Sequence, residues 1–173
     1  MINGHGDDLY KYNVEVKSNF SSNIYSHADL SGLKKHLAGR MDVIGSYPEP
    51  EPYSLEKALA EECGIEANEI MVTNGATEAI YLAARLTNEK FAGSGINLIS
   101  MPTFSEYADA CRMAGGKTMS SESGYRGEAT HWMCNPNNPT GTVIGGKELL
   151  NIAAESKNDI FVIDQSYEHY TTL

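Results

Sequence analysis

The stretch Asn135-Pro136-Asn137-Asn138-Pro139-Thr140-Gly141 carries most of the information in this chain of 173 residues. A proline disfavours helical backbone in the residue before it, and Gly141 permits backbone angles that other residues avoid. The apolar run just before this stretch, at positions 132–134, is typical of a buried strand. We therefore predict a rigid loop at a strand end that holds the Asn138 amide in a fixed direction toward a ligand. A plain proline-rich turn is the alternative.

Around this loop, short apolar runs alternate with segments of helical periodicity. Strands are predicted at 70–73, 96–100, 130–134 and 160–164, and helices follow at 76–86, 104–114 and 147–156. Two earlier helices are predicted, one at 29–39 and one that runs from a cap at Ser54 to Gly64. The alternation predicts an α/β fold with three αβα layers and a mainly parallel sheet. In such sheets ligands bind at the carboxyl ends of the strands.

The composition restricts the class of partner. The net charge of −10 at pH 7 argues against nucleic acid or an anionic membrane, although it permits one small anion held by local donors. No apolar run is long enough to span a bilayer and no signal-peptide pattern opens the chain, so we expect a cytoplasmic protein. The three widely spaced cysteines fit neither a disulfide framework nor a zinc site. We predict no metal site and buried free thiols at Cys63, Cys111 and Cys134.

The segment Asn74-Gly75-Ala76-Thr77 joins a predicted strand to a predicted helix. Gly75 lets backbone amides approach an anion closely, and the start of the helix offers free N–H groups and the positive end of its dipole. Thr77 adds a hydroxyl group. These features predict a phosphate site without a lysine, unlike a Walker loop. A plain strand-to-helix turn capped by Asn74 or Thr77 explains the same residues equally well.

Three more aromatic or charged side chains fall at predicted strand ends. Phe104 either packs into the core or stacks on a planar ring. Asp164 ends an apolar strand, where a carboxylate needs a partner because an unpaired buried charge is costly. A protonated ring nitrogen or a helix N-terminus would provide that partner. Tyr167, three residues later, brings a phenol to the same edge of the sheet.

Four motifs occur in the order, and nearly at the spacing, found in the class I/II aminotransferases, which are fold-type I enzymes that use pyridoxal 5′-phosphate (PLP). They are VTNGATEAI (72–80), PTFSEY (102–107), NPNNPTG (135–141) and VIDQSY (162–167). The stretch YPEPEP (47–52) resembles histidinol-phosphate aminotransferases. The pair His5-Gly6 and the cluster NFSSNI (19–24) resemble the related threonine-phosphate decarboxylases of cobalamin synthesis.

The resemblance implies that PLP binds at the strand ends. The residues that would bind it are Ala76 and Thr77 on the phosphate, Phe104 on the ring face, Asn138 and Tyr167 on the ring hydroxyl, and Asp164 on the ring nitrogen. Tyr47 would reach the phosphate of the neighbouring subunit, which implies a homodimer. A small phosphorylated amino-acid substrate would be bound by His5, Gly6, Asn23 and Asn138.

The resemblance further implies a lyase that removes CO2 from O-phosphothreonine to give aminopropanol phosphate for cobalamin biosynthesis. Loss of the α-proton instead would make the enzyme an aminotransferase, acting on histidinol phosphate or an amino acid. The position of the substrate, rather than a different catalytic group, decides between the two reactions. The alternative from another class is a non-catalytic fragment that binds PLP or phosphate, or that mediates dimerisation.

The resemblance also shows where this sequence departs from the family. The family's Schiff-base lysine lies in a Ser-x-x-Lys segment downstream of Tyr167, which this sequence does not contain. We therefore expect the N-terminal portion of a longer enzyme, without the catalytic lysine and inactive alone. Residues 1–44 would form an N-terminal arm and a small-domain segment, and residues 45–173 an incomplete PLP-binding large domain. The short connection from 114 to 132 is interpreted as one from which a strand and a helix are trimmed.

Overall fold

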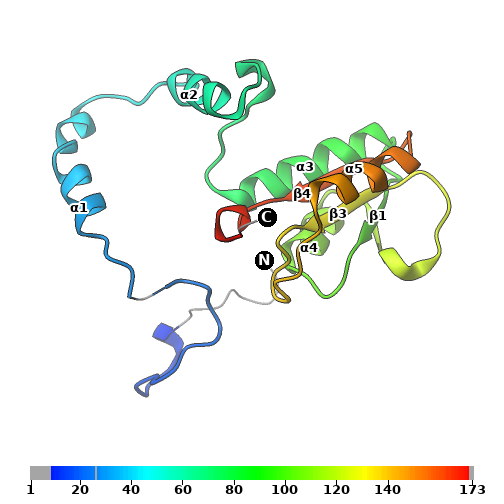
Figure 1. The fold of residues 1–173 in the computed structure, drawn as a ribbon, viewed down its shortest axis with the longest axis horizontal. Helices are drawn as coiled ribbons and strands as arrows, with labels where there is room; N and C mark the ends of the chain where they lie inside the picture. Colours follow the sequence, from blue (N-terminus) through cyan, green and yellow to red (C-terminus); the bar gives the residue numbers. More distant parts are fainter. Residues whose placement is uncertain (1–8, 26, 172–173) are drawn as a thin grey trace. The chain divides into compact units, whose positions relative to one another are not determined.

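The computed structural model describes residues 9–25 and 27–171. By its packing the chain separates into two compact units, Met1–Val72 and Thr73–Leu173 (Figure 1). The predicted boundary between residues 44 and 45 concerns the domains of the family rather than this packing, and it stays a prediction. Among the described residues, no helix has both the length and the apolar character needed to cross a membrane.

Within its described residues, the first unit contains two α-helices, α1 (Ser31–Ala38) and α2 (Tyr53–Cys63). As predicted, α2 ends where Gly64 takes a left-handed conformation, with φ 69°. Its start differs from the prediction, because Ser54 lies inside the helix instead of capping it. The Ser54 hydroxyl donates to Glu49 Oε2 at 2.9 Å. Short 3-10 turns complete this unit at Leu9–Lys11, Met41–Gly45 and Ala67–Glu69.

The second unit is built on a sheet whose four described strands run parallel in the order β2-β1-β3-β4. The strands are β1 (Ile96–Ile99), β2 (Lys117–Ser120), β3 (Thr130–Cys134) and β4 (Ile160–Asp164). The register pairs Cys134 with Asp164, so the last residues of β3 and β4 lie side by side. The strands predicted at 96–100, 130–134 and 160–164 are confirmed.

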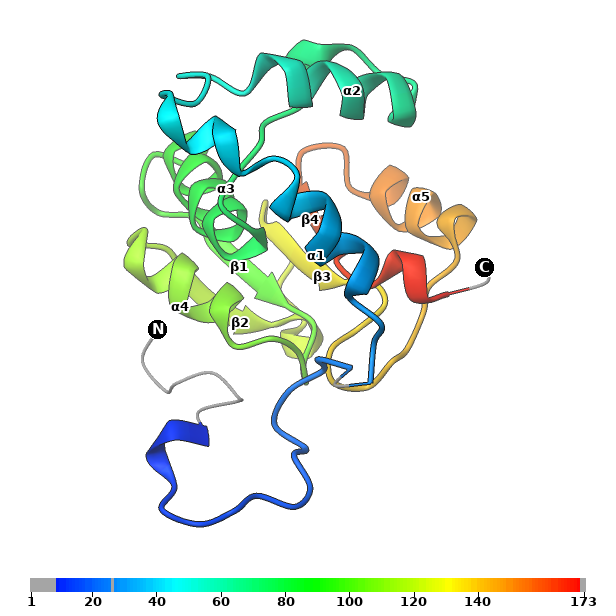
Figure 2. The same cartoon turned by 90° about the vertical axis from the view of Figure 1, so that its left-hand side faces the viewer.

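Helices cover both faces of this sheet. They are α3 (Ala76–Lys90), α4 (Glu106–Met113) and α5 (Gly146–Glu155). Figure 2 shows α3 and α4 on one face and α5 on the opposite face. The three-layer αβα arrangement predicted from the strand–helix alternation is therefore confirmed. Because these strands are parallel, each connection has to cross back over the sheet, and the carboxyl ends of the strands therefore lie at the same edge.

Two predictions about the strands are wrong. Positions 70–73 form no strand, because an apolar run becomes a strand only beside a hydrogen-bonded partner, and none pairs with it among the described residues. Conversely, the connection from 114 to 132 keeps a strand, since it contains β2, which pairs with β1. That a helix is trimmed from this connection stays a prediction. The sequence of β2, Lys-Thr-Met-Ser, is largely exposed at the sheet edge, so it lacks the apolar pattern of a buried strand.

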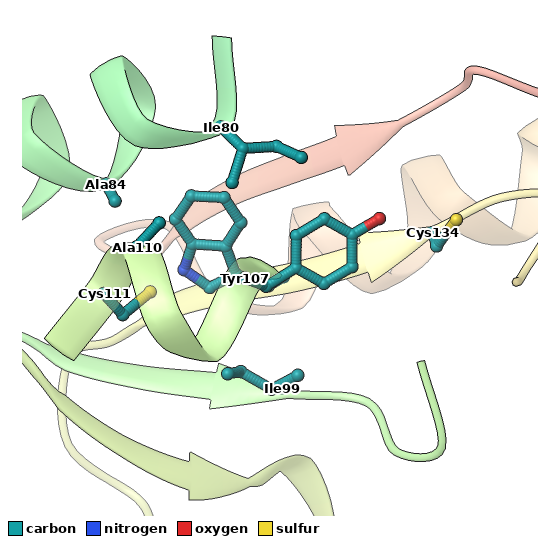
Figure 3. Packing of buried hydrophobic residues seen from close by; sticks show 8 residues of the cluster. Ile80, Ala84, Ile99, Tyr107, Ala110, Cys111 and Cys134 are labelled. Atoms are coloured by element: carbon teal, nitrogen blue, oxygen red, sulfur yellow. The ribbon is translucent and has the colours of Figure 1, made fainter. Parts of the chain in front are cut away.

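The core lies between the sheet and the layer formed by α3 and α4 (Figure 3). Its largest buried side chains include Trp132 of β3 and Tyr107 of α4, whose rings stack with their centroids 5.8 Å apart. The thiols of Cys111 and Cys134 are buried and free, as predicted. The prediction is wrong for Cys63, which is exposed because α2 contributes a single buried residue to its unit.

Candidate functional site

A cavity of about 230 Å³ opens at the carboxyl ends of β3 and β4, beside the start of α3. All of its lining residues belong to the second unit. They are Asn74, Gly75, Ala76, Thr77, Phe104, Tyr107, Cys134, Asn138, Asp164, Ser166 and Tyr167. The structure therefore brings together six of the residues that the sequence singled out, namely Ala76, Thr77, Phe104, Asn138, Asp164 and Tyr167.

We call residues 74–77 the helix end of the cavity. Gly75 has φ 85° and ψ 169°, a conformation that residues with a β-carbon rarely adopt. It turns the chain directly into α3, whose first turn has no side-chain cap, so its first N–H groups can serve an anion. The alternative was a turn capped by Asn74 or Thr77, but neither side chain forms a capping hydrogen bond at the start of α3. Instead, the Asn74 N–H donates to the Glu78 carboxylate.

We call Phe104, Asn138, Asp164 and Tyr167 the strand end of the cavity. The carboxylate of Asp164 has partners that the sequence did not identify. The Tyr107 hydroxyl donates to Oδ2 at 2.8 Å. The Ser166 hydroxyl donates to Oδ1 at 2.6 Å, and the Ser166 backbone N–H donates to the same oxygen at 2.9 Å. A carboxylate accepts about four hydrogen bonds, so these three donors leave it able to accept one more from the cavity.

Tyr107 connects this carboxylate to the core. Burial raises the pKa of Tyr107 well above its usual value, and the hydrogen bonds with Cys134 and Asp164 raise it further. The phenol therefore keeps its proton and acts as the donor. Its ring stacks on Trp132 and meets Phe104 edge-to-face, with 5.8 Å between centroids in each case. Figure 3 shows the hydroxyl directed along the sheet toward Cys134.

The loop 135–141 is held by two of its three asparagines. The Asn135 carboxamide forms two hydrogen bonds with the backbone of Ile144. It accepts from the Ile144 N–H at 2.8 Å and donates to the Ile144 carbonyl at 2.9 Å. The Asn137 carboxamide donates to the carbonyl of Pro102, in the loop after β1, at 2.9 Å. Among the described residues the Asn138 carboxamide has no hydrogen-bond partner, and it lines the cavity. The loop is therefore anchored through Asn135 and Asn137, and it places Asn138 at the cavity. That the Asn138 amide is held toward a ligand stays a prediction.

The two aromatic residues of the strand end are half-buried. Phe104 lies just before α4, which begins two residues later than predicted. It packs against the core cluster and also lines the cavity, so its two interpretations are compatible. Tyr167 follows β4 and lines the same cavity. Their contacts with a bound ring stay predictions.

The remaining predicted site residues are not part of this cavity. Tyr47 and Asn23 belong to the first unit, where both are exposed, and their roles in binding a phosphate and a substrate stay predictions. His5 and Gly6 lie outside the described residues.

Sequence reasoning missed two residues that line the cavity and bind Asp164. Tyr107 lies about one helical turn after Phe104, a spacing that places both on one side of a helix start. Ser166 lies two residues after Asp164, where a backbone N–H commonly donates to an aspartate side chain. These two spacings were the signals that could have found them.

The family model described as aminotransferase class I and II matches residues 15–172 of this chain. The adenosylcobalamin biosynthesis bifunctional protein CobDQ of Leptospira interrogans is 28% identical over 97% of this chain and 22% of its own length. A histidinol-phosphate aminotransferase of Shewanella oneidensis is 29% identical over 92% of this chain and 44% of its own length.

A solved structure shows the same relation in three dimensions. The crystal structure of L-threonine-O-3-phosphate decarboxylase from Porphyromonas gingivalis matches with a TM-score of 0.75 and 34% identity, over 87% of this chain and 47% of that one. The chain thus spans less than half the length of each of these relatives. Since the family model covers nearly every residue, this chain belongs to the class I and II aminotransferase family.

Proposed function

We propose that this chain provides part of the PLP site of a decarboxylase that converts O-phosphothreonine to aminopropanol phosphate for cobalamin biosynthesis. The observation that carries the proposal is that the six residues to which the family resemblance gives a role in binding PLP line one cavity. The similarity to a threonine-phosphate decarboxylase, at 34% identity, supports the choice of reaction.

The donors and acceptors around the cavity suit the chemical groups of PLP. At the helix end, the first N–H groups of α3 and the Thr77 hydroxyl can donate to a phosphate. At the strand end, Asp164 suits a protonated ring nitrogen, Asn138 and Tyr167 suit the ring hydroxyl, and Phe104 offers an aromatic face. No lysine is among the described residues that line the cavity, so we expect non-covalent binding there.

In this proposal each residue has a definite task. Bound PLP would supply an electron sink for the electrons of the bond that breaks at the substrate α-carbon. Asp164 would keep a proton on the ring nitrogen by pairing with its positive charge. Asn138 would orient the substrate carboxylate, and that orientation decides whether CO2 or a proton leaves. Thr77 would fix the cofactor through its phosphate.

Two other functions have observations in their favour. An aminotransferase acting on histidinol phosphate or an amino acid is supported by the 29% identity to a histidinol-phosphate aminotransferase. A non-catalytic fragment that binds PLP or phosphate, or that dimerises, is supported by the described cavity lining, which contains no lysine. The set of Asp164, Asn138 and Tyr167 favours chemistry, since simple phosphate binding needs only the helix end.

Stable conjugates, in which a secondary amine joins C4′ of the reduced cofactor to the α-carbon of a substrate, separate these functions without requiring turnover. We would titrate the chain calorimetrically with conjugates of O-phosphothreonine, histidinol phosphate and glutamate, and with pyridoxamine 5′-phosphate. The decarboxylase proposal predicts that the phosphothreonine conjugate binds tightest, by about tenfold, or about 1.4 kcal/mol. Preference for another conjugate would favour an aminotransferase. Equal affinities would favour the non-catalytic fragment, and no binding at all would overturn the PLP site.

A covalent trap tests the expectation about lysine. Treatment with PLP followed by borohydride should produce no stoichiometric adduct at a single lysine, because no described lysine lines the cavity. Mass spectrometry of the digested protein would locate any label. One fully labelled lysine would contradict the non-covalent site.

The proposed homodimer rests on Tyr47, whose side chain is fully exposed in the first unit. We propose that it reaches the phosphate site of the neighbouring subunit. Sedimentation velocity with and without pyridoxamine 5′-phosphate would measure the dimer, and Tyr47→Phe should weaken ligand binding without changing the fold. A chain that binds this ligand fully as a monomer would argue against the shared site.

A further inference from the structure

Tyr107 is not among the residues that the sequence linked to PLP, yet it contacts two of them. Its hydroxyl donates to Asp164 Oδ2 at 2.8 Å, and its ring meets Phe104 edge-to-face at an angle of 84°. We propose that Tyr107 is a positioning residue, which holds the Asp164 carboxylate and the Phe104 ring in the orientation that a pyridine ring in the cavity requires. This inference deepens the proposed function and rests on it.

The tyrosine ring is itself fixed by the core. Only 1% of Tyr107 is exposed, and its ring stacks on Trp132 at an interplanar angle of 27°. Trp132 is anchored in turn, because its Nε1 donates to Asn97 Oδ1 of β1 at 2.9 Å. Rotation of the tyrosine would require repacking of this close-packed layer. The hydroxyl therefore keeps its direction toward Asp164 whether or not a ligand is bound.

The bonding around Asp164 assigns the tyrosine proton. Because burial and two neighbouring groups raise the pKa of Tyr107, the phenol stays protonated at neutral pH and can only donate to Oδ2. Ser166 donates to Oδ1. With neutral donors on both oxygens, the carboxylate is fixed in one orientation and still has acceptor capacity for a cationic ring nitrogen. Ser166 is exposed and local in sequence, whereas Tyr107 ties the carboxylate to the core.

The chain contains a second tyrosine–carboxylate pair that serves as a matched control. The Tyr81 hydroxyl of α3 donates to Glu106 Oε2, also at 2.8 Å, and Tyr81 packs against the same core cluster. Neither residue lines the cavity. Tyr81→Phe and Tyr107→Phe thus remove the same group from the same kind of bond, and only one of the two bonds faces the proposed cofactor.

The test compares two ligands, pyridoxamine 5′-phosphate and its 1-deaza analogue, which carries C–H in place of the ring nitrogen. Both are amines, so neither reacts with surface lysines. Tyr107→Phe should weaken pyridoxamine 5′-phosphate about tenfold and change the deaza analogue by less than about twofold, because the analogue cannot pair with Asp164. Tyr81→Phe should leave both affinities unchanged. Calorimetric titration measures each affinity, and thermal unfolding shows that each variant is folded.

The outcomes distinguish this inference from the proposed function. Equal weakening of both ligands by Tyr107→Phe, or no weakening of either, overturns the positioning role and leaves the PLP site intact. Failure of the unaltered chain to bind either ligand overturns the PLP site and the inference with it.

A second measurement needs no variant. With 13C-labelled tyrosine, the Cζ resonance of Tyr107 should shift when pyridoxamine 5′-phosphate binds, because the ring nitrogen and the phenol share one carboxylate. It should shift far less with the deaza analogue. Identical shifts with both ligands would overturn the inference.

Discussion

The two ends of the cavity differ in the kind of group that they offer to a ligand. The helix end, residues 74–77, offers mainly backbone N–H groups, which are oriented by the unusual conformation of Gly75 and the start of α3. The strand end offers side chains, and Asp164 among them is held by Tyr107 and so by the core. A single side-chain substitution can therefore abolish a contact at the strand end. At the helix end, a substitution abolishes a contact of this kind only if it changes the backbone conformation, because the donors are backbone N–H groups.

The difference also concerns what each end recognises. Backbone donors at a helix start suit any small anion and carry little chemical selectivity. A carboxylate, a carboxamide, a phenol and a phenyl ring, arranged around one space, suit a planar heterocycle with a basic nitrogen. We therefore expect both ends to contribute to affinity, and the strand end to determine which ligand is bound.

The largest expected effect comes from removing the support beneath the strand end. Trp132→Ala should lower the free energy of unfolding by about 3–5 kcal/mol, because it leaves a cavity under Tyr107 and deprives buried Asn97 of its donor. Urea denaturation followed by circular dichroism measures this loss. Leu150→Ala, at an exposed position of α5, is the control and should change stability by less than about 0.5 kcal/mol. A small effect at Trp132 would show that the strand end does not depend on the core.

Asp164→Asn should have the next largest effect, on ligand affinity rather than folding. Pyridoxamine 5′-phosphate should bind about 2–3 kcal/mol more weakly, because the neutral amide cannot compensate the charge on a ring nitrogen. The neighbouring Gln165→Ala is the control, since Gln165 is exposed and does not line the cavity. Unchanged affinity in Asp164→Asn would remove the claim that the strand end identifies the ligand.

Gly75→Ala tests the helix end without removing any side-chain donor. A β-carbon at Gly75 meets no atom within 4 Å, so the substitution creates no clash. The energetic cost is that of holding alanine in the backbone conformation of Gly75, about 2 kcal/mol. We expect weaker binding of pyridoxamine 5′-phosphate and little change for pyridoxamine, which lacks the phosphate. Gly145→Ala, at the start of α5 with φ −66°, is the matched control and should be close to neutral. Equal losses for both ligands would argue against a phosphate at the helix end.

The same contrast explains how much of the site was predictable. Asp164 and Asn138 were found because each lies at the carboxyl end of an apolar strand, and parallel strands bring such positions to one edge. Thr77 was found at the start of α3, although the strand predicted before it does not form. The fold class followed from the same patterns. The partners of Asp164 were not found, because Tyr107 approaches it from an element 57 residues earlier in the chain. Sequence spacing gives no measure of such a contact.

The misplaced strands have a related cause. Positions 70–73 have the composition of a strand without a partner among the described residues, whereas β2 has a partner and lacks the composition. Strand formation depends on hydrogen bonding to a neighbouring strand. The amino-acid composition of a segment is a poor guide to strand formation at the edges of a sheet. Cys63 was misassigned for a similar reason, since burial depends on what packs against α2 and not on the residue type alone.

The smallest expected effect lies at the opposite ends of β3 and β4 from the cavity. Asp159 accepts a hydrogen bond from the Ala129 N–H at 2.9 Å and contacts His131 Nε2 at 2.9 Å. Burial raises the pKa of Asp159, but the hydrogen bonds from Ala129 and His131 outweigh burial, and the pKa is lowered from 3.8. Because the folded pKa lies below the unfolded value, this carboxylate stabilises the fold above pH 3.8, and the contribution disappears as the pH falls through the folded pKa.

Asp159→Asn should therefore cost about 1 kcal/mol of stability at pH 7, and the difference from the unaltered chain should shrink as the pH falls below 3.8. Urea denaturation over a series of pH values measures both effects. The affinity for pyridoxamine 5′-phosphate at pH 7 should stay within about twofold, because Asp159 does not line the cavity. A loss of affinity as large as that of Asp164→Asn would mean that the two ends of the β3–β4 pair are coupled. The strand end would then owe its geometry to the whole sheet and not to Tyr107 and the core beneath it.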